Sequence, residues 1–290
     1  MGIRRRFFLQ VGLGVLIAPV IPACNRPTSQ AGLKPSAPLQ AAIKDRGHLL
    51  VATEDYYPPF EFLVNGKPAG LDHELLTMLQ KRAPFEVRQE ILPWQPILPG
   101  VGEGKFDAAI TAASITDDRA KFLDFTMPIS ETTQFYLKRQ GDARLTQLKD
   151  LAGRTIGVQR GGVSAESLPY LEAALKPHGG VLGTVQEYGS FDQAYRDLES
   201  GRLDAVVHNI VSLSILLGEK PGIFELGEAV SPRSYAAWAV KKGNQPLLDY
   251  LNQFLAQVRQ SGELAELQQY WLKRTFELPD RPLLPGDRPI

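Results

Sequence analysis

Short apolar runs alternate with amphipathic segments along most of the chain. Residues 49–53, 85–92 and 108–111 have the length and apolar content of strands, and residues 71–83 repeat apolar positions at the spacing of one helix face. Residues 97–103 form a shorter helical segment between the second and third of these strands. This β-α-β-α-β order predicts a mainly parallel sheet flanked by helices.

A second series with the same order follows. Strands are predicted at residues 155–158, 185–188 and 205–207, and helices at residues 164–175 and 191–199. Two α/β lobes of similar construction are therefore expected. Ligands of open α/β folds bind beyond the carboxyl ends of the strands, so we expect the residues that follow these strands to face a shared cleft.

One short sequence pattern occurs in both series. Residues 104–110 read GKFDAAI, and residues 201–207 read GRLDAVV. In each copy a glycine, which tolerates the left-handed conformation, ends a helix, and an aspartate leads into an apolar strand. The first copy continues into residues 111–119 and the second into residues 208–209. We expect the two continuations to contribute to one site from opposite lobes.

Composition narrows the classes of function. The 290 residues include 32 basic and 32 acidic side chains, so the formal net charge is zero and no nucleic-acid surface is indicated. With 43% hydrophobic residues, the chain is long enough for one large core or two smaller ones. The four histidines are scattered and there is one cysteine, so we expect neither a metal site nor a disulfide framework, and no cofactor.

The N-terminus carries export signals. Arginines at residues 4–6 precede an apolar segment, residues 11–21, which is too short for the roughly 30 Å of bilayer hydrocarbon that about 20 helical residues span. We therefore expect a signal peptide at residues 1–23. The sequence RRFFLQ from residue 5 resembles a twin-arginine motif, and general secretion is the alternative route.

Cys24 follows the sequence Ile-Pro-Ala, which resembles a bacterial lipobox. Lipidation of this cysteine would anchor the mature protein to a membrane, with residues 24–44 as the lipidated N-terminus and linker. Pro22 departs from the usual pattern, and a lone cysteine beside an ordinary cleavage site is the alternative interpretation. The expected location is the periplasm or the extracytoplasmic face of a membrane.

Several stretches of the mature chain match one known family in the same order. They are residues 53–62 (TEDYYPPFEF), 70–75 (GLDHEL), 94–99 (WQPILP), 111–119 (TAASITDDR), 124–128 (DFTMP), 156–162 (IGVQRGG) and 201–206 (GRLDAV). From about residue 45 to residue 272 the chain thus resembles the periplasmic solute-binding proteins of polar amino-acid ABC transporters. The resemblance implies a two-lobed, type II periplasmic-binding-protein fold of the α/β class, with the ligand in the cleft between the lobes.

The resemblance also implies an organisation and a function. Lobe 1 would comprise residues 45–134 and 236–275, lobe 2 residues 135–235, and the proline-rich residues 276–290 would form a C-terminal tail. Such a protein is expected to be a monomer without enzymatic activity. It would capture a small polar amino acid or a related carboxylate by hinge closure and deliver it to the permease of an ABC transporter.

Roles for individual residues follow from the same resemblance. Arg119 would bind the ligand α-carboxylate through two parallel charge-assisted hydrogen bonds, which suits a planar guanidinium. The other implied ligand-binding residues are Thr111, Ala112 and Ser114, Glu54 at the end of the first strand, the aromatic Tyr57 and Trp94, Gly162 and Ser164 at a helix start, and His208 with Asn209.

Structural roles are the alternative for some of these residues. Arg119 could pair with Asp117 or Asp118 at the start of a helix. Trp94 could belong to the core, and His208 could be a structural residue at the end of a strand. The sequence alone leaves both interpretations open.

One position departs from the family pattern. Asn209 stands where amino-acid binders commonly have an aspartate that pairs with the ligand α-ammonium, so either Glu54 supplies that charge or the ligand lacks an α-amino group. An enzyme on the same scaffold is therefore the alternative function, a periplasmic dehydratase with Glu54, Glu166 or His208 as candidate acids. A sensor module is a third possibility, but we expect no signalling domain after Leu272.

Overall fold

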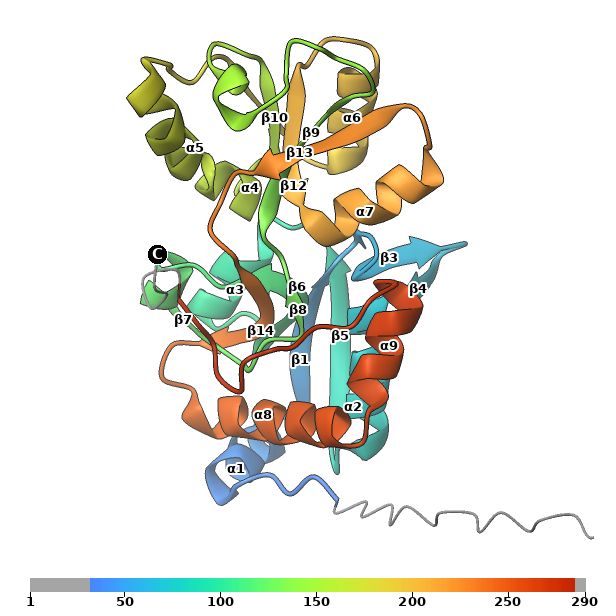
Figure 1. Cartoon of the computed structure of the whole chain (residues 1–290). Helices are drawn as coiled ribbons and strands as arrows, with labels where there is room; N and C mark the ends of the chain where they lie inside the picture. Colours follow the sequence, from blue (N-terminus) through green and yellow to red (C-terminus); the bar gives the residue numbers. More distant parts are fainter. Residues whose placement is uncertain (1–31, 285–290) are drawn as a thin grey trace, which may run out of the picture. The chain divides into compact units, whose positions relative to one another are not determined.

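The structure, a computed structural model, describes residues 32–284, which form two α/β lobes (Figure 1). The predicted signal peptide, the lipidation site Cys24 and the last six residues of the tail lie outside the described residues. No helix within residues 32–284 has the length and apolar character that a membrane-spanning helix requires.

The first lobe is built on a six-stranded mixed sheet of order β5-β1-β6-β14-β7, with β8 paired to β14. β1 runs parallel to β5 and β6, whereas β14 is antiparallel to β6, β7 and β8. The strands are β1 (His48–Glu54), β5 (Glu86–Leu92), β6 (Ala108–Ser114), β7 (Leu123–Phe125), β8 (Ser130–Glu131) and β14 (Tyr235–Lys241).

Helices cover both faces of this sheet because its central strands are apolar on both sides. Along β6, Ala108 and Ile110 pack into one hydrophobic cluster and Ala109 and Ala113 into the other, as the alternation of side chains in a strand requires. The helices of this lobe are α1 (Ala37–Arg46), α2 (Leu71–Arg82), α3 (Ile97–Glu103), α8 (Gln245–Gln260) and α9 (Glu263–Trp271), with the 3-10 turn η1 (Arg119–Lys121). A small antiparallel sheet adds β2 (Tyr56–Tyr57), β3 (Glu61–Val64) and β4 (Lys67–Ala69).

The second lobe repeats the plan on a five-stranded sheet of order β11-β10-β12-β9-β13. Its strands are β9 (Gln134–Arg139), β10 (Ile156–Gln159), β11 (Val185–Tyr188), β12 (Ala205–Asn209) and β13 (Phe224–Ala229). Its helices are α4 (Val163–Glu166), α5 (Leu168–Leu175), α6 (Phe191–Glu199) and α7 (Ile210–Glu219), with the 3-10 turns η2 (Leu148–Leu151) and η3 (Lys176–His178). β10 is parallel to β11 and β12, and β9 is antiparallel to β12 and β13.

Two neighbouring segments connect the lobes. The chain passes from β8 to β9 through Thr132 and Thr133, and it returns from β13 to β14 through residues 230–234. The two segments are hydrogen-bonded to each other, from Thr132 N to Ser234 O at 2.7 Å and from Ser234 N to Thr133 Oγ1 at 3.1 Å. Two short segments of this kind are the structural basis for a hinge.

The single helix predicted at residues 164–175 is wrong. The structure divides it into α4 and α5, with Ser167 between them. Pro169, the second residue of α5, has no N–H to donate to the carbonyl four residues earlier, so a continuous helix would lose a hydrogen bond and collide with the proline ring.

The predicted ends of two strands are too early. Residues 112–114 belong to β6 and residues 208–209 to β12, rather than following these strands. All seven residues of β6 and all five of β12 are buried, including polar ones, because both strands end at the contact between the lobes. The antiparallel strands β9, β13 and β14 were not predicted, because an alternation of strands and helices indicates parallel strands only.

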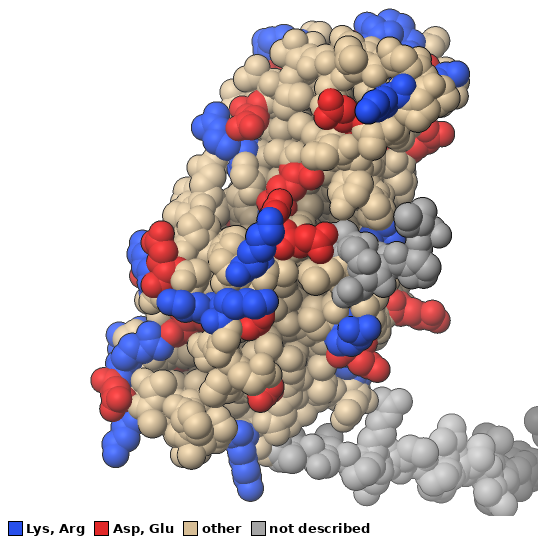
Figure 2. All heavy atoms as spheres, turned by 90° about the vertical axis from the view of Figure 1, so that its left-hand side faces the viewer, with Lys and Arg blue, Asp and Glu red and all other residues tan. Residues whose placement is uncertain are grey.

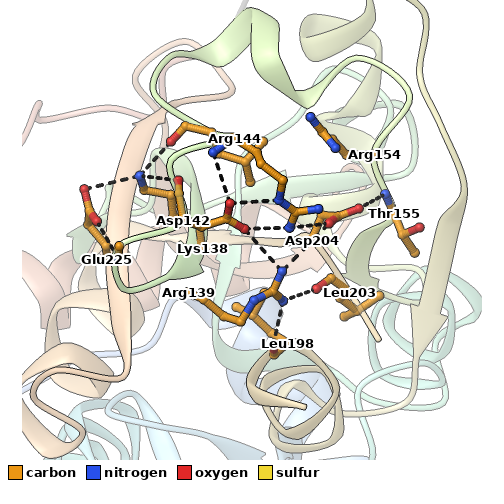
Figure 3. Close-up of polar contacts among 12 residues, drawn as sticks. Lys138, Arg139, Asp142, Arg144, Arg154, Thr155, Leu198, Leu203, Asp204 and Glu225 are labelled. Carbon is orange, nitrogen blue, oxygen red and sulfur yellow. Dashed lines mark hydrogen bonds and ion pairs between the residues drawn. The ribbon is translucent and has the colours of Figure 1, made fainter. Parts of the chain in front are cut away.

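In both lobes the aspartate of the repeated sequence pattern forms the same pair of hydrogen bonds with the neighbouring strand, here called the aspartate clasp. Figure 3 shows the second copy. Asp204 Oδ2 accepts a hydrogen bond from Thr155 N at 3.1 Å while Asp204 N donates to Thr155 O at 2.9 Å. In the first lobe, Asp107 Oδ2 accepts from Leu50 N at 2.8 Å and Asp107 N donates to Leu50 O at 2.8 Å. Each aspartate thereby ties the start of its own strand to the neighbouring parallel strand, at the end of the sheet opposite the cleft.

An arginine forms an ion pair with the aspartate of each aspartate clasp. Arg46 pairs with Asp107, and Arg144 Nη2 lies 2.9 Å from Asp204 Oδ1. Arg144 also pairs with Asp142 and holds the pKa of that carboxyl well below its usual range through a side-chain hydrogen bond (Figure 3). The repeat is thus explained by sheet construction in each lobe.

Replacing the second aspartate tests the clasp. Asp204→Ala is expected to lower the free energy of unfolding by about 1 to 3 kcal/mol, because the Thr155 N–H loses its acceptor. Asp204→Asn keeps an oxygen acceptor at the same place and should cost less. Urea denaturation of both variants measures the difference, and equal losses for the two would show that the backbone hydrogen bond contributes nothing.

Candidate functional site

The candidate site lies where the carboxyl ends of four strands, two from each sheet, approach one another. β1 ends at Glu54 and β6 at Ser114 in the first lobe, and β10 ends at Gln159 and β12 at Asn209 in the second. Contacts between the lobes at this place bring together most of the predicted site residues. This is the geometry expected of a ligand site in an open α/β fold.

Arg119 lies at the centre of these contacts. It is only 4% exposed, and its Nε and Nη2 atoms lie 3.0 Å and 2.9 Å from Oε1 of Glu166 in the second lobe. Its Nη1 donates to the backbone carbonyl of Ser114 at 3.0 Å. A buried guanidinium without such partners would be strongly unfavourable, so Glu166 and the end of β6 fix its position. Asp117 and Asp118, the structural alternatives from the sequence, do not pair with it: the salt bridges of the described residues join Asp118 to Lys121.

Trp94 covers the guanidinium and touches the second lobe. The centre of its ring lies 5.1 Å from Cζ of Arg119, and its Nε1 donates to the carbonyl of Gly161 at 2.8 Å. A tryptophan face attracts a cation within about 6 Å, so this contact stabilises the buried charge. Trp94 also packs in the second hydrophobic cluster of the first lobe, as its core interpretation expects, whereas its contact with a ligand stays a prediction.

Glu54 contacts a residue that the sequence did not single out. Gln159 Nε2 donates to Glu54 Oε1 at 3.0 Å across the lobes. Glu54 is buried, and burial, which outweighs the hydrogen bond from Gln159, raises the pKa of Glu54 to about 8. The carboxyl group is therefore mostly protonated at neutral pH. Gln159 lies within the matched stretch of residues 156–162, but nothing in its type or spacing marks it as a site residue.

Asn209 has two structural roles. Its Oδ1 accepts from Ser212 N at 2.9 Å and so caps the N-terminus of α7, as asparagine commonly does. Its Nδ2 donates to the hydroxyl of Tyr57, in the other lobe, at 3.0 Å. Tyr57 is buried as well, so the aromatic position predicted from the sequence is part of the contact between lobes.

His208 lies in an aromatic cluster. Its ring stacks on Phe191 with 3.4 Å between ring centres, its Nδ1 is hydrogen-bonded to the Tyr195 hydroxyl at 2.5 Å, and Tyr57 stacks on it at 5.8 Å. Burial lowers the pKa of His208 to about 3, so the imidazole is neutral. Nε2 is buried without a hydrogen-bond partner among the described residues. This environment fits the structural interpretation of His208 and gives it no charge to offer a ligand.

The predicted residues of β6 and α4 are buried at the same place. Thr111 Oγ1 donates to Glu61, and Ser114 Oγ donates to Thr132 Oγ1 at 3.0 Å. Ser164 Oγ accepts from Gln159 N at 3.0 Å and thereby holds the turn before α4. The hydroxyls of Thr111, Ser114 and Ser164 thus have partners within the protein.

The remaining two predicted positions lack polar side chains. Ala112 is 2% exposed and packs in the first core cluster. At Gly162 an added Cβ would lie 2.8 Å from Oε1 of Gln159, so a side chain there would require Gln159 to move. Only the backbone of these residues is available to a ligand.

Behind Thr111 two carboxyl groups lie in the core of the first lobe. Glu61 and Asp72 are both completely buried and hydrogen-bonded to each other, and Trp238 Nε1 donates to Asp72 Oδ1 at 2.6 Å. Burial, reinforced by the neighbouring Asp72, raises the pKa of Glu61 well above its usual range. Burial also raises the pKa of Asp72 to about 6. Two adjacent carboxyl groups with raised pKa values share a proton, as like charges in contact require.

A pocket of about 100 Å³ lies between the lobes, beside the pair formed by Arg119 and Glu166. Its lining comprises Ile115, Thr116, Asp117 and Asp118 from the first lobe, Val163, Glu166, Ser167 and Tyr170 from α4 and α5, and Ser231, Pro232 and Ser234 from the returning connection. Three of these residues are acidic. The face of the molecule seen in Figure 2 mixes both signs of charge.

Within residues 32–284, no group of three or more histidine, cysteine, aspartate and glutamate side chains has the arrangement to hold a metal ion. The described part of the site offers hydrogen-bond donors, a guanidinium, carboxyl groups and aromatic faces. This arrangement is suited to binding a small polar molecule with a carboxylate.

Two α/β lobes joined by two segments, with a buried arginine where their strand ends meet, define a two-lobed ligand-binding protein. Residues 49–274 match the family model of bacterial extracellular solute-binding proteins, family 3, and the chain belongs to this family. The resemblance seen in the sequence is therefore confirmed.

Individual relatives agree with this assignment. The chain is 30% identical over 232 residues to the L-cystine-binding protein TcyJ of Escherichia coli (strain K12), which covers 79% of this chain and 84% of that protein. A solved structure of an ancestral arginine-binding protein bound to arginine aligns with a TM-score of 0.67 and 31% identity, over 78% of this chain and 98% of that one. An ancestral amino-acid-binding protein, a precursor of cyclohexadienyl dehydratase, aligns with a TM-score of 0.69 and 25% identity, over 81% and 99%. The predicted two-lobed fold is confirmed.

The buried carboxyl pair predicts a pH dependence of stability. Because the pKa values of Glu61 and Asp72 are raised in the folded protein, the folded state keeps a proton that the unfolded chain releases. Their contribution is full below their ordinary pKa values of about 4 and is lost as the pH rises through about 6 and above.

Glu61→Gln removes one titrating group, and its amide can donate to Asp72 while its oxygen still accepts from Thr111. As the pH rises above the ordinary carboxyl range of about 4, the variant's free energy of unfolding should increase relative to that of the parent, by up to about 1.4 kcal/mol for each unit by which the pKa of Glu61 is raised. Urea denaturation at several pH values measures this, with Glu74→Gln on the exposed face of α2 as the matched control. A difference that does not change with pH would mean that Glu61 titrates normally.

Proposed function

We propose that this chain is an extracytoplasmic binding protein that captures a small polar amino acid, or a related carboxylate, and delivers it to the permease of an ABC transporter. Arg119 carries the proposal, because its planar guanidinium is buried between the lobes and pairs there with a carboxylate, Glu166, so it is placed to bind the carboxylate of a ligand instead. Membership of the solute-binding family supports the transport role. The protein would act as a monomer, close by rotation at the two connecting segments, and catalyse no reaction.

The relatives narrow the choice of ligand. One binds L-cystine by its name, and one was solved with arginine bound. Both ligands are α-amino acids with polar side chains, and an α-carboxylate suits Arg119. A thermal-shift screen of the twenty amino acids, cystine, small dicarboxylates and quaternary amines identifies the ligand, since a ligand at 100 times its dissociation constant adds about 2.7 kcal/mol of stability. If nothing in this screen raises the melting temperature, the transport proposal is wrong.

The carboxylate clamp predicts the effect of a conservative change. Arg119→Lys keeps the charge but loses the planar pair of donors, so the ligand identified in the screen should bind at least about 1.5 kcal/mol more weakly. Isothermal titration calorimetry measures the affinity, and circular dichroism confirms that the variant is folded. Unchanged affinity would remove Arg119 from the ligand site.

We also propose that the mature protein is a lipoprotein anchored through Cys24 after removal of residues 1–23. The lipobox-like sequence before Cys24 supports this, as does the position of the chain's only cysteine. Several acyl chains, at about 0.8 kcal/mol for each buried methylene, would hold the domain at a membrane surface.

Cys24→Ser therefore should move the protein from the membrane fraction to the soluble extracytoplasmic fraction, because the acceptor of the lipid is removed. Fractionation followed by immunoblotting measures the distribution, with the unaltered chain as control. A variant that still sediments with membranes would show that something other than Cys24 anchors the protein.

A dehydratase-like enzyme is the second candidate, and Glu54 is the observation that favours it. A carboxyl group with a pKa of about 8 can donate a proton at neutral pH, as a general acid must. One structural neighbour is a precursor of cyclohexadienyl dehydratase. Incubation of the purified protein with a cyclohexadienyl carboxylic acid, followed by ultraviolet absorbance of an aromatic product, tests this, and turnover that disappears in Glu54→Gln would favour the enzyme.

A further inference from the structure

The proposed function assigns a partner to the ligand carboxylate but none to its α-ammonium group. An α-amino acid carries an ammonium group next to its carboxylate, and an ammonium group is a donor that needs acceptors. A carboxylate is the strongest acceptor that a protein offers to it. Asp117 and Asp118 line the pocket but are exposed to solvent, so the candidates beside Arg119 are Glu54, Glu166 and the side-chain oxygen of Asn209.

Asn209 is unsuited to this role by its hydrogen bonds. Its oxygen caps α7 by accepting from Ser212 N at 2.9 Å, and the group it directs toward the first lobe is the donor Nδ2, 3.0 Å from the Tyr57 hydroxyl. A donor repels another donor. To accept from an ammonium group, Asn209 would have to turn and leave the end of α7 without its cap.

Glu54 is a weak partner for a different reason. Its oxygen Oε1 is already bonded to Gln159 Nε2 at 3.0 Å, and the raised pKa leaves the group mostly uncharged at neutral pH. A neutral carboxyl group offers an ammonium only a dipole. Ionising Glu54 would first require the cost of charging a buried group.

Glu166 has a free oxygen beside Arg119. Its oxygen Oε1 contacts the guanidinium of Arg119 at 2.9 Å, so the group is placed at the carboxylate-binding position. Its other oxygen, Oε2, is buried and has no hydrogen-bond partner among the described residues. Glu166 also lines the pocket between the lobes, together with Ser234.

Ser234 adds an independent sign that this pocket takes a polar group. Its side chain is 7% exposed, it lies on the pocket lining, and its Oγ has no hydrogen-bond partner in the described structure. A buried hydroxyl without a partner costs about 1 to 3 kcal/mol, so such atoms are usually satisfied by water or by a ligand. Asp117 lines the same pocket and makes it more favourable for a cation.

We propose that Glu166 binds the α-ammonium group of the ligand, whose head group enters between Arg119 and Glu166. The carboxylate of the amino acid replaces Glu166 on the guanidinium, and the ammonium group then pairs with the released Glu166 carboxylate, with Ser234 Oγ as a further acceptor. This inference rests on the proposed function. The exchange is favourable because the single ion pair between Arg119 and Glu166 is replaced by two: Arg119 pairs with the ligand carboxylate, and Glu166 pairs with the ligand ammonium group. The charges of an amino-acid head group are thus complementary to those of Arg119 and Glu166.

Glu166 would also determine specificity. A carboxylic acid without an α-amino group would have to displace Glu166 from Arg119 and would give it nothing in return, so two carboxylates would be left close together. Repulsion of this kind selects against the wrong ligand as effectively as attraction selects the right one.

The test compares each amino acid with its analogue that lacks only the α-amino group. The probes are L-arginine with 5-guanidinopentanoic acid, L-cystine with 3,3′-dithiodipropanoic acid, and L-histidine with 3-(imidazol-4-yl)propanoic acid. Isothermal titration calorimetry gives the dissociation constants for the parent, for Glu166→Gln, and for the control Glu172→Gln, which removes one negative charge from an exposed position of α5.

In Glu166→Gln, the preference for the amino acid over its analogue should fall at least about tenfold, because only the amino acid loses a charged partner. The analogue itself should bind as tightly as before or more tightly, since it no longer displaces a carboxylate. Ser234→Ala, a second variant that removes no charge, should lower the same preference by a smaller factor, and Glu172→Gln should not change it.

If Glu166→Gln weakens the binding of an amino acid and of its analogue equally, the assignment of Glu166 is overturned. The residue would then stabilise the contact between the lobes rather than bind the ammonium group. The assignment is also overturned if Glu172→Gln lowers the preference as much as Glu166→Gln does. If none of these three binds the parent, the amino acid found in the thermal-shift screen and its analogue without the α-amino group take their place, and failure of every amino acid in that screen would instead overturn the amino-acid-binding proposal on which the inference rests. The two failures are therefore distinguishable.

Discussion

A guanidinium that is 4% exposed must have its charge and its donors satisfied by whatever surrounds it, and this requirement organises the centre of the molecule. Glu166 from the second lobe forms an ion pair with Arg119, the backbone carbonyl of Ser114 accepts a hydrogen bond from it, and Trp94 lies over the face of the guanidinium. Partners from both lobes are needed. The relative position of the lobes in this structure therefore depends on the contacts that stabilise the buried charge of Arg119.

The carboxyl groups around Arg119 differ in how deeply they are buried and in which partners they have. Glu54, Glu61 and Asp72 are deeply buried, and desolvation raises their pKa values, so Glu54 is mostly neutral near pH 7 and Glu61 shares a proton with Asp72. Glu166 is 31% exposed and lies against Arg119. Burial thereby reduces the negative charge carried by these three acids, whereas Glu166 forms an ion pair with the arginine. For a ligand that carries both charges, this pairing matters more than the number of acids.

Much of the fold could be predicted because it depends on local patterns. Apolar runs alternating with amphipathic helices indicated two α/β lobes, and the repeated glycine-to-aspartate pattern marked the same position in both. The break between α4 and α5 was missed although Pro169 signals it, because the apolar spacing continues across the proline. The antiparallel strands β9, β13 and β14 were missed, since such strands pair with segments far away in the chain. Ala108 of β6, for example, pairs with Val240 of β14.

By itself the sequence determined which side chains are available near the strand ends: Glu54, Arg119, His208 and Asn209 were all singled out through the resemblance of their surrounding stretches to a known family. Only the tertiary structure decided what each of them does. The oxygen of Asn209 is taken by the start of α7, His208 is neutral inside an aromatic cluster, and Glu54 is bonded to Gln159. The physical reason is that charge and hydrogen-bonding capacity depend on burial and on partners, and those partners come from segments far away in the chain.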